Sequence, residues 1–312
     1  MTEKRVLIIG RMSMSLIMNM FKLPELGEYA VDDGGVAYMP GGEGAGVAMA
    51  YARLGADALL SGKIGADAHG QRLYKYYKDQ GVNTSLIKVD REEPTALSVI
   101  MREAAGERTL VYPGAGAKYS PENVSEALSH SPDALHISFG LPWGLVVGAA
   151  RSAAYRGVPI IAHATEASPE QALEALPELE LFLLDDKEAL AYTGIMPESS
   201  ESSLRCALAL YKRIKAKYVV IRQGERGAFI YDGKKYFIIG APKAGKMVDT
   251  SSMPEAFVAA LTLEFLRTED IRASVRFALS SAALTAAKEG SFSTVPTDGE
   301  VRQFMLKSGF GY

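Results

Sequence analysis

The chain has 312 residues, of which 48% are hydrophobic and 23% charged, and its formal net charge is −3 at pH 7. These are the proportions of an ordinary globular protein, and they exclude the basic surface that nucleic acid or an anionic membrane requires. One cysteine, Cys206, and four scattered histidines exclude both an internal disulfide and a Cys/His metal cluster.

Neither a membrane span nor a signal peptide is expected. No apolar run reaches the ~18–20 residues of a membrane span. The apolar run at 6–9 is too short and too strand-like for a signal peptide. Together with the single cysteine, this predicts a cytoplasmic protein.

The first elements predict a buried strand followed by a hairpin. Residues 6–9 are wholly apolar and end at Gly10, as in the buried strand of a parallel sheet. An Asp-Gly turn within 11–40 predicts a hairpin. The same segment carries four methionines, which either fill gaps in the core or form an adaptable ligand surface: Met12, Met14, Met18 and Met20.

Glycine-rich residues 41–46 precede a helix predicted over 47–54, and a strand is expected at 58–61. Asp67 is a suitable N-cap for a helix over 69–80. Two β-rich runs, 95–102 and 108–112, predict a second hairpin. With residues 11–40, this hairpin supplies a small sheet set apart from the main one.

From residue 120 onward, helices alternate with short apolar runs at 134–138, 159–162, 181–184, 218–221 and 229–231. This alternation is typical of βαβ units, in which helices cover both faces of a parallel sheet. The sequence therefore predicts an α/β fold.

The stretch with the clearest chemistry runs from Gly245 to Leu266. An extended segment ends at small polar residues, and a strongly apolar helix then begins. The backbone N–H groups and the dipole at such a helix N-terminus form an anion site.

This stretch, Val248-Asp249-Thr250 followed by four residues and an acid, resembles the C-terminal signature of the PfkB (ribokinase-like) carbohydrate kinases. Residues 40–70 resemble the N-terminal signature of the family, and two intervening segments match as well. The resemblance implies a three-layer α/β fold with a mostly parallel central sheet and a small β-sheet lid. It also implies one domain over 1–312, with a lid of segments 11–40 and 94–116.

On the sugar side, the resemblance assigns Gly41 and Gly42 to close approach of the backbone to the substrate. Several polar anchors of the family are replaced by small residues. Ser15 lies where an aspartate is usual, and Ser13 is assigned to the substrate with it. Glycines lie where the family has asparagine or an acid: Gly46, Gly116 and Gly140. Trp143 then offers a stacking surface to a bulkier ligand, or else belongs to the core or to an interface.

On the nucleotide side, the resemblance implies ATP and Mg²⁺ as cofactors. Asp185 replaces the asparagine of an Asn-x-x-Glu segment, and Glu188 keeps the acid that organises Mg²⁺ and phosphate through water. Arg222, Gly224 and Gly227 match the nucleotide-binding strand and turn.

The catalytic motif departs from the family's Gly-Ala-Gly-Asp, because it reads Ser252-Met253-Pro254-Glu255. Glu255 can serve as the general base, and Ser252 and Met253 retain N–H groups for the anion site, but Pro254 has none. Alternatively, Ser-x-x-Glu is a capping box in which Glu255 bends back to the helix start.

Two functions follow. The first is ATP-dependent phosphoryl transfer to a hydroxyl of a sugar or nucleoside-like small molecule, with altered or weak activity. The alternative is a catalytically inactive kinase-fold protein that binds a nucleotide or small metabolite. The resemblance also implies a homodimer formed through the lid.

Overall fold

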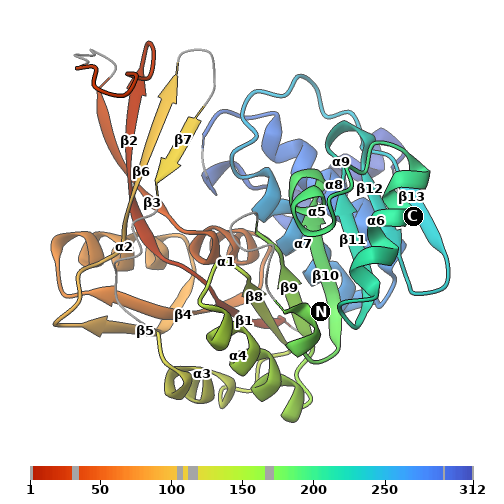
Figure 1. Ribbon diagram of the computed structural model, residues 1–312, viewed down its shortest axis with the longest axis horizontal. Helices are drawn as coiled ribbons and strands as arrows, with labels where there is room; N and C mark the ends of the chain where they lie inside the picture. The colour runs from red at the N-terminus through yellow and green to blue at the C-terminus, as the bar shows by residue number, and fades with distance from the viewer. Residues whose placement is uncertain are drawn as a thin grey trace.

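The computed structural model describes residues 3–29, 35–103, 108–111, 119–165, 172–290 and 292–310. Its main sheet has nine strands in the order β13-β12-β11-β10-β9-β8-β1-β4-β5 (Figure 1). Their bounds are β1 Arg5–Ile9, β4 Asp57–Gly65, β5 Asn83–Asp90, β8 Ala134–Ser138, β9 Ile160–His163, β10 Leu179–Asp185, β11 Ala216–Arg222, β12 Ala228–Tyr231 and β13 Tyr236–Ile239.

Strands β5 to β11 of this order pair in parallel, and β12 and β13 continue the sheet antiparallel. The predicted mostly parallel sheet is therefore confirmed. Parallel strands end at one edge, so the loops that leave β1, β8, β10 and β11 meet there. This edge is where the candidate site lies.

Helices cover both faces of the sheet and produce two hydrophobic cores. In β1, Val6 and Ile8 face one core while Leu7 and Ile9 face the other, because side chains alternate along a strand. The first core packs against α1 Glu43–Arg53, α2 Ala68–Asp79, α7 Met253–Thr268, α8 Ile271–Ala286 and α9 Asp298–Ser308. The second packs against α3 Pro121–Leu128, α4 Trp143–Tyr155, α5 Asp186–Thr193 and α6 Ser200–Tyr211.

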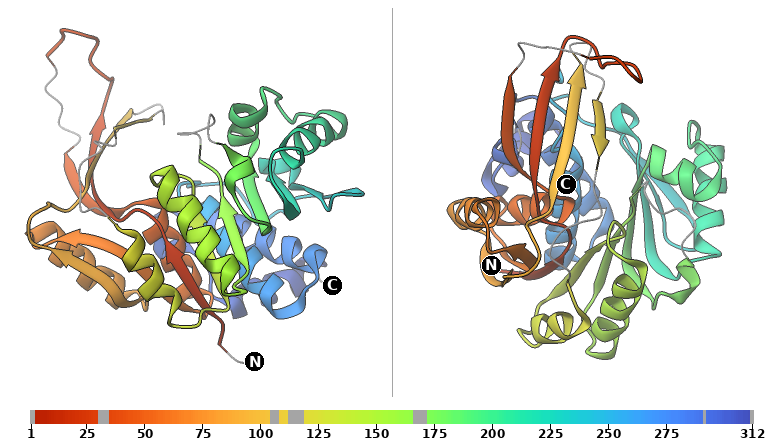
Figure 2. Two further views of the ribbon diagram at one scale, coloured as in Figure 1. Left: turned by 60° about the horizontal axis from the view of Figure 1, so that its bottom comes forward. Right: turned by 60° about the vertical axis from the view of Figure 1, so that its left-hand side comes forward.

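A four-stranded sheet projects from one end of the main body, as the views in Figure 2 show. Its order is β3-β2-β6-β7, with β2 Ser13–Met20, β3 Val36–Gly41, β6 Leu97–Glu103 and β7 Arg108–Val111. We call it the lid sheet. Strand β2 pairs antiparallel with β3 and parallel with β6, and β6 forms the predicted hairpin with β7. The turn expected at 33–34 lies outside the described residues.

The methionines at the start of this segment belong mainly to the core. Met12 and Met14 are buried in the first core, and Met20 is buried as well. Asp67 is the N-cap of α2, as predicted, and accepts a hydrogen bond from Gly70 N–H at 2.8 Å. The same carboxylate also accepts from Thr95 N–H at 2.7 Å, which ties α2 to the segment that enters β6. None of the described helices is long and apolar enough to cross a membrane.

Candidate active site

The N-terminus of α7 lies between two pockets. One pocket, of about 400 Å³, lies under the lid sheet, and we call it the lid pocket. The other, of about 690 Å³, is bounded by α8 and by the segment after β13, and we call it the α8 pocket. Asp249, Ser251, Ser252 and Glu255 line the lid pocket, whereas Thr250 and Met253 line the α8 pocket. A single segment thus forms the partition between them.

The floor of the lid pocket is backbone at the start of α1. Gly41 and Gly42, which the resemblance assigns to the substrate, both line it. Gly42 has φ +92°, and a side chain there would collide with the backbone of Arg11. A Cβ on Gly41 would strike the hydroxyl of Ser15. Neither position accepts a side chain, so only bare backbone can face a ligand here.

The two serines assigned to the substrate differ in position. Ser15 lines the lid pocket and shares a 2.8 Å hydrogen bond with Ser98 of β6. Ser13 is fully buried against Gly41 and is not among the described residues that line the pocket. Gly116, the third lid assignment, lies outside the described residues.

Gly46 lies inside α1, beside Glu255. A Cβ at this position would lie 2.5 Å from Cε1 of Phe292 and 3.1 Å from Cγ of Glu255. Real Cβ atoms do not approach other atoms so closely, so the aromatic ring occupies the space that a side chain at 46 would need. The asparagine of the family therefore has no room here, and Phe292 lines the pocket instead.

The capping-box prediction for Ser252 and Glu255 is wrong. Ser252 is the residue before α7, but its side chain makes no cap hydrogen bond, and its hydroxyl is buried without a hydrogen-bond partner. Its φ of −107° and ψ of 8° depart from the extended conformation that turns an N-cap side chain toward the helix. Glu255 instead lines the lid pocket.

Backbone donors at the predicted anion site are partly used within the loop. Met253 N–H donates to the carbonyl of Thr250 at 3.3 Å, and Ser251 N–H donates to Asp249 Oδ1 at 2.9 Å. Pro254 has no N–H to offer. The 3.3 Å bond is long for an N–H···O contact, so an incoming oxyanion can compete for this donor.

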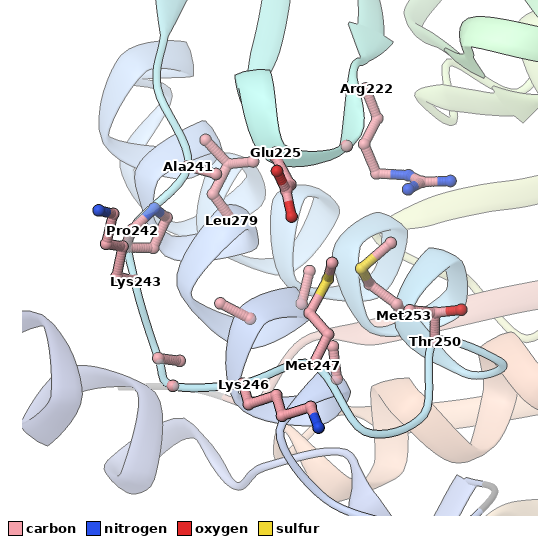
Figure 3. A pocket seen from close by; sticks show the side chains of 16 residues that line it. Arg222, Glu225, Ala241, Pro242, Lys243, Lys246, Met247, Thr250, Met253 and Leu279 are labelled. Carbon is pink, nitrogen blue, oxygen red and sulfur yellow. The ribbon is translucent and has the colours of Figure 1, made fainter.

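Figure 3 shows the α8 pocket, with Arg222 and Glu225 on one side and Met247, Met253 and Lys246 on the other. Small residues of α8 form a smooth apolar wall: Ala282, Ala283 and Ala286, next to Leu279. A cavity of this size with apolar walls and a few polar groups is typical of a cofactor site. Lys243 and Lys246 supply positive charge to the lining of the same pocket.

The predicted nucleotide glycines serve different purposes. Gly224 lines the α8 pocket, whereas Gly227 holds the turn between β11 and β12. Gly227 has φ +92° and ψ −125°, and a Cβ there would collide with the carbonyl of Ile239. The segment after Ile239 leads directly into Ala241 and Pro242, which line the pocket. Gly227 therefore positions a wall of the pocket.

Replacing Gly227 by Ala is expected to lower the free energy of unfolding by about 1–3 kcal/mol, because only glycine adopts this backbone conformation without strain. Urea unfolding measures this loss, and nucleotide binding should weaken in parallel. Gly148→Ala, in the interior of α4 with no neighbour within 4 Å of a built Cβ, is the matched control and should not destabilise. Equal stability of the two variants would contradict this role of Gly227.

Asp185 and Glu188, predicted for the Mg²⁺ side, form the capping box of α5. Asp185 accepts from Glu188 N–H at 2.9 Å, and Glu188 Oε2 accepts from Asp185 N–H at 2.7 Å. Arg222 donates to Asp185 at 3.2 Å, so the pair adjoins the α8 pocket through a residue that lines it. This reciprocal arrangement is the one that the sequence pattern suggested for 252–255.

Mg²⁺ retains several waters and binds mainly to substrate phosphates, with one or two carboxylates from the protein. Within the part of the chain that the structure describes, no three His, Cys, Asp or Glu side chains gather to hold a metal. The described residues therefore do not fit a metal site built from protein alone, and a nucleotide-bound Mg²⁺ would depend on phosphate oxygens and water, with Glu188 as the acid that the resemblance assigns to it.

Two neighbouring histidines, His136 buried and His163 mostly buried, lie behind the site. His136 contacts the Tyr51 hydroxyl at 3.2 Å through Nδ1, and His163 lies next to it with ring centres 6.3 Å apart. Burial, together with the neighbouring His163, lowers the pKa of His136 to about 3. Burial and the charge of Arg222 lower the pKa of His163 to about 4. Both rings are therefore neutral in the folded protein at pH 7.

Stability should fall as the pH drops from about 6.5 toward 4. In this window the unfolded chain protonates both histidines and the folded chain does not, so each histidine contributes a slope of up to about 1.4 kcal/mol per pH unit. Urea unfolding at pH 7.5, 6 and 5 measures how the free energy of unfolding changes with pH. His136→Asn should have a shallower slope than the wild type, and identical slopes would contradict the assignment.

Trp143 is half-buried, packs against the second core and is not among the described residues that line either pocket. Its ring meets Phe139 edge-on at 5.2 Å, so the core interpretation is confirmed and the stacking surface is not supported. Two lid-pocket residues, Glu43 and Phe292, were not predicted. Both lie in segments that resemble family motifs, but no role was assigned to either side chain, because their contacts are with Gly140 and Gly46, far away along the chain.

Comparison with solved structures defines the fold class. Arabidopsis thaliana ribokinase complexed with ribose and ATP superposes with a TM-score of 0.84 at 20% identity, covering 97% of this chain and 99% of that one. Ribokinase from Giardia lamblia gives a TM-score of 0.87 at 19% identity, covering 98% and 99%. The fold is therefore ribokinase-like, as expected.

The sequence itself defines the family. Residues 3–298 match the pfkB family carbohydrate kinases, and the chain belongs to that family. Ribokinase of Bacillus subtilis is 28% identical over 306 residues, covering 97% of this chain and 99% of its own length. A bifunctional ribokinase/ribose-5-phosphate isomerase A of Fructilactobacillus sanfranciscensis is 26% identical over 94% of this chain, which spans 55% of that longer protein.

Proposed function

We propose that this protein transfers the γ-phosphoryl group of ATP to a hydroxyl of a small sugar or sugar-like compound. The observation that carries the proposal is the partition formed by residues 249–255, some of which line one pocket and some the other. A phosphoryl group leaving a nucleotide in the α8 pocket needs only to cross this helix N-terminus to reach an acceptor in the lid pocket. In-line transfer requires this placement of donor and acceptor.

Glu255 is the proposed general base. Its carboxylate side chain comes from the first turn of α7 and lines the lid pocket, within reach of an acceptor hydroxyl. It takes the proton of that hydroxyl as the oxygen attacks phosphorus. The N-terminal dipole of α7 and the amide of Met253 stabilise the charge on the transferred group.

The adenine ring would lie on the alanine face of α8, with the phosphates extending toward Thr250. Lys246 and Lys243 would neutralise phosphate charge at the rim. Mg²⁺, when bound, would neutralise negative charge that develops on the transferred phosphoryl group. Glu188 and Asp185 would orient its water shell.

A second function has its own observation. Pro254 lacks a donor, and the Met253 amide already donates to Thr250, so the anion site is poorer than a helix N-terminus allows. A protein with this loop could bind nucleotide or a metabolite without turnover. Replacing residues 252–255 by Gly-Ala-Gly-Asp tests this alternative. If the protein is a kinase whose loop lacks an anion-site donor, the turnover rate should rise, whereas a protein that only binds its ligand should stay inactive.

The direct test is ADP release from Mg²⁺-ATP with a panel of sugars and nucleosides. ADP release that depends on one acceptor supports the kinase. Thermal stabilisation by ATP without acceptor-dependent ADP release in wild type and rebuilt variant would favour the binder.

We also propose a cytoplasmic location and a homodimer through the lid sheet. The buried free thiol of Cys206 fits a reducing compartment. Exposed apolar side chains on the lid, Phe21, Tyr38 and Val111 among them, favour a partner surface there. Sedimentation velocity of Tyr38→Glu against wild type tests the dimer.

A further inference from the structure

The two faces of the lid sheet have different neighbours. In the antiparallel pairing of β2 with β3, Ser15 lies opposite Met39, and Leu16 lies opposite Tyr38. Directly opposed residues project from the same face of a sheet, and successive residues project from opposite faces. Ser15 and Met39 line the lid pocket, so Tyr38 projects from the back of the lid sheet, the face turned away from the pocket.

On this back face, Tyr38 stacks on His69 of α2. The ring centres are 5.5 Å apart and the ring planes are inclined by 29°. His69 lies in the first turn of α2, two residues after the N-cap Asp67. Helix α2 lies beside the base of the lid sheet and also contacts β2 (Figure 1). A helix of the main body therefore supports the lid sheet from behind.

The start of α2 holds the lid at a second strand as well. Asp67 accepts hydrogen bonds from the N–H and from the hydroxyl of Thr95, both at 2.7 Å. Thr95 lies two residues before β6, which pairs with β2 on the side opposite β3. The first residues of α2 thus fix the lid sheet on both sides of β2, through Thr95 on one side and Tyr38 on the other.

Strand β3 carries part of the wall of the lid pocket. Met39, Pro40 and Gly41 line the pocket, whereas the proposed base, Glu255, comes from α7 in the main body. Within the described lid sheet, β3 is an edge strand that pairs with β2. Separation of β3 from β2 would break the stack on His69 together with the hydrogen bonds of the ladder. The stack therefore stabilises the position of this part of the wall.

We propose that Tyr38 and His69 are positioning residues for the acceptor, because their stack holds β3 against the lid pocket from behind. This inference rests on the proposed function in that it takes the lid pocket as the acceptor site. A wall that contacts the acceptor equally in the ground state and in the transition state affects KM and leaves kcat unchanged. The stack therefore sets the affinity for the acceptor and not the rate of phosphoryl transfer.

Hydrogen exchange of the unliganded protein tests the stack independently of activity. In His69→Ala, the amides of β3 should exchange about 2- to 10-fold faster than in wild type, the factor that one aromatic pair is worth, while those of β8 should not change. His69→Phe keeps an aromatic face and should exchange as wild type does. The matched control is His130→Ala, exposed beyond the end of α3 and away from the lid sheet (Figure 1), which should change neither strand.

Steady-state kinetics test the positioning role. The acceptor is whichever of ribose, fructose and glucosamine gives the highest rate of ADP release with saturating Mg²⁺-ATP. With it, His69→Ala should raise KM about 2- to 10-fold and keep kcat within about twofold, and His69→Phe should restore KM. A lower kcat at unchanged KM, or no recovery with phenylalanine, would contradict a role through stacking.

Tyr38 also belongs to the exposed lid surface that is proposed for the dimer, so a double-mutant cycle isolates the stack. His69→Ala should alter exchange and KM in the wild-type background but not in a Tyr38→Ala background, where the partner ring is already absent. An effect of His69→Ala that persists without Tyr38 would overturn the inference. A changed sedimentation coefficient of His69→Ala would also overturn it, because the ring would then act through the subunit interface.

The two proposals fail differently. If no sugar releases ADP, the kinase proposal fails, and the hold of α2 on the lid is decided by hydrogen exchange alone. If the amides of β3 exchange at the wild-type rate in His69→Ala, the inference falls whether or not the protein is a kinase.

Discussion

Glu255→Gln is expected to reduce acceptor-dependent ADP release about 10²- to 10⁴-fold, the usual contribution of a positioned general base. The amide keeps the size of the side chain but cannot take a proton from the attacking hydroxyl. Because Glu255 lines the lid pocket and makes no capping box with Ser252, this change should leave the start of α7 intact. Steady-state kinetics with saturating Mg²⁺-ATP measure the loss.

The controls separate chemistry from folding and binding. Urea unfolding of Glu255→Gln should agree with wild type within about 1 kcal/mol, as expected when no cap is lost. ATP affinity should also stay the same, because Glu255 is not among the residues that line the α8 pocket. If Glu255→Gln turns over within about threefold of the wild-type rate, Glu255 is not the general base.

Gly46→Asn is the second change with a large expected effect, and its direction is counterintuitive. It installs the residue that is usual in the family, yet its Cβ would lie 2.5 Å from Phe292 and 3.1 Å from Glu255. To make room for the asparagine, the side chain of Phe292 or that of Glu255 must move. A displacement of the base by about 1 Å can cost about 100-fold, so we expect kcat/KM to fall by about that factor.

Removing the obstructing ring should reverse part of this loss. In Gly46→Asn/Phe292→Ala, the asparagine gains the space that the aromatic ring occupies, and Glu255 can return to its position. Kinetics of the two single variants and the double variant form a cycle that measures this coupling. Additive losses would show that Phe292 and position 46 do not compete for one space.

Regular elements of the core were predictable because burial imposes a periodic pattern. The run at 134–138 matches β8, and Asp67 caps α2. No strand was predicted for β5 or β13, which lie at the two edges of the main sheet. Strand β5 mixes polar with apolar residues and therefore lacks the continuous apolar run that marks a buried parallel strand. Strand β13 is apolar in sequence, but it is only four residues long and half-exposed at the sheet edge.

Only those features of the site that depend on local sequence motifs were predictable. Acid-x-x-Glu at 185–188 and Ser-x-x-Glu at 252–255 are equivalent patterns, yet only the first forms a capping box. The difference is the backbone conformation of the N-cap residue, which the surrounding fold imposes. The contacts of Glu43 with Gly140 and of Phe292 with Gly46 join distant segments, and no single-sequence pattern reveals them.

The most direct measurement of the central claim is the fate of the γ-phosphorus of ATP, followed by ³¹P NMR with Mg²⁺ and the acceptor panel. If residues 249–255 separate a nucleotide from an acceptor hydroxyl, a phosphomonoester resonance should grow as ATP is converted to ADP, only when an acceptor is present. ATP that binds but persists with every acceptor, or that yields only inorganic phosphate, would contradict phosphoryl transfer across the helix N-terminus.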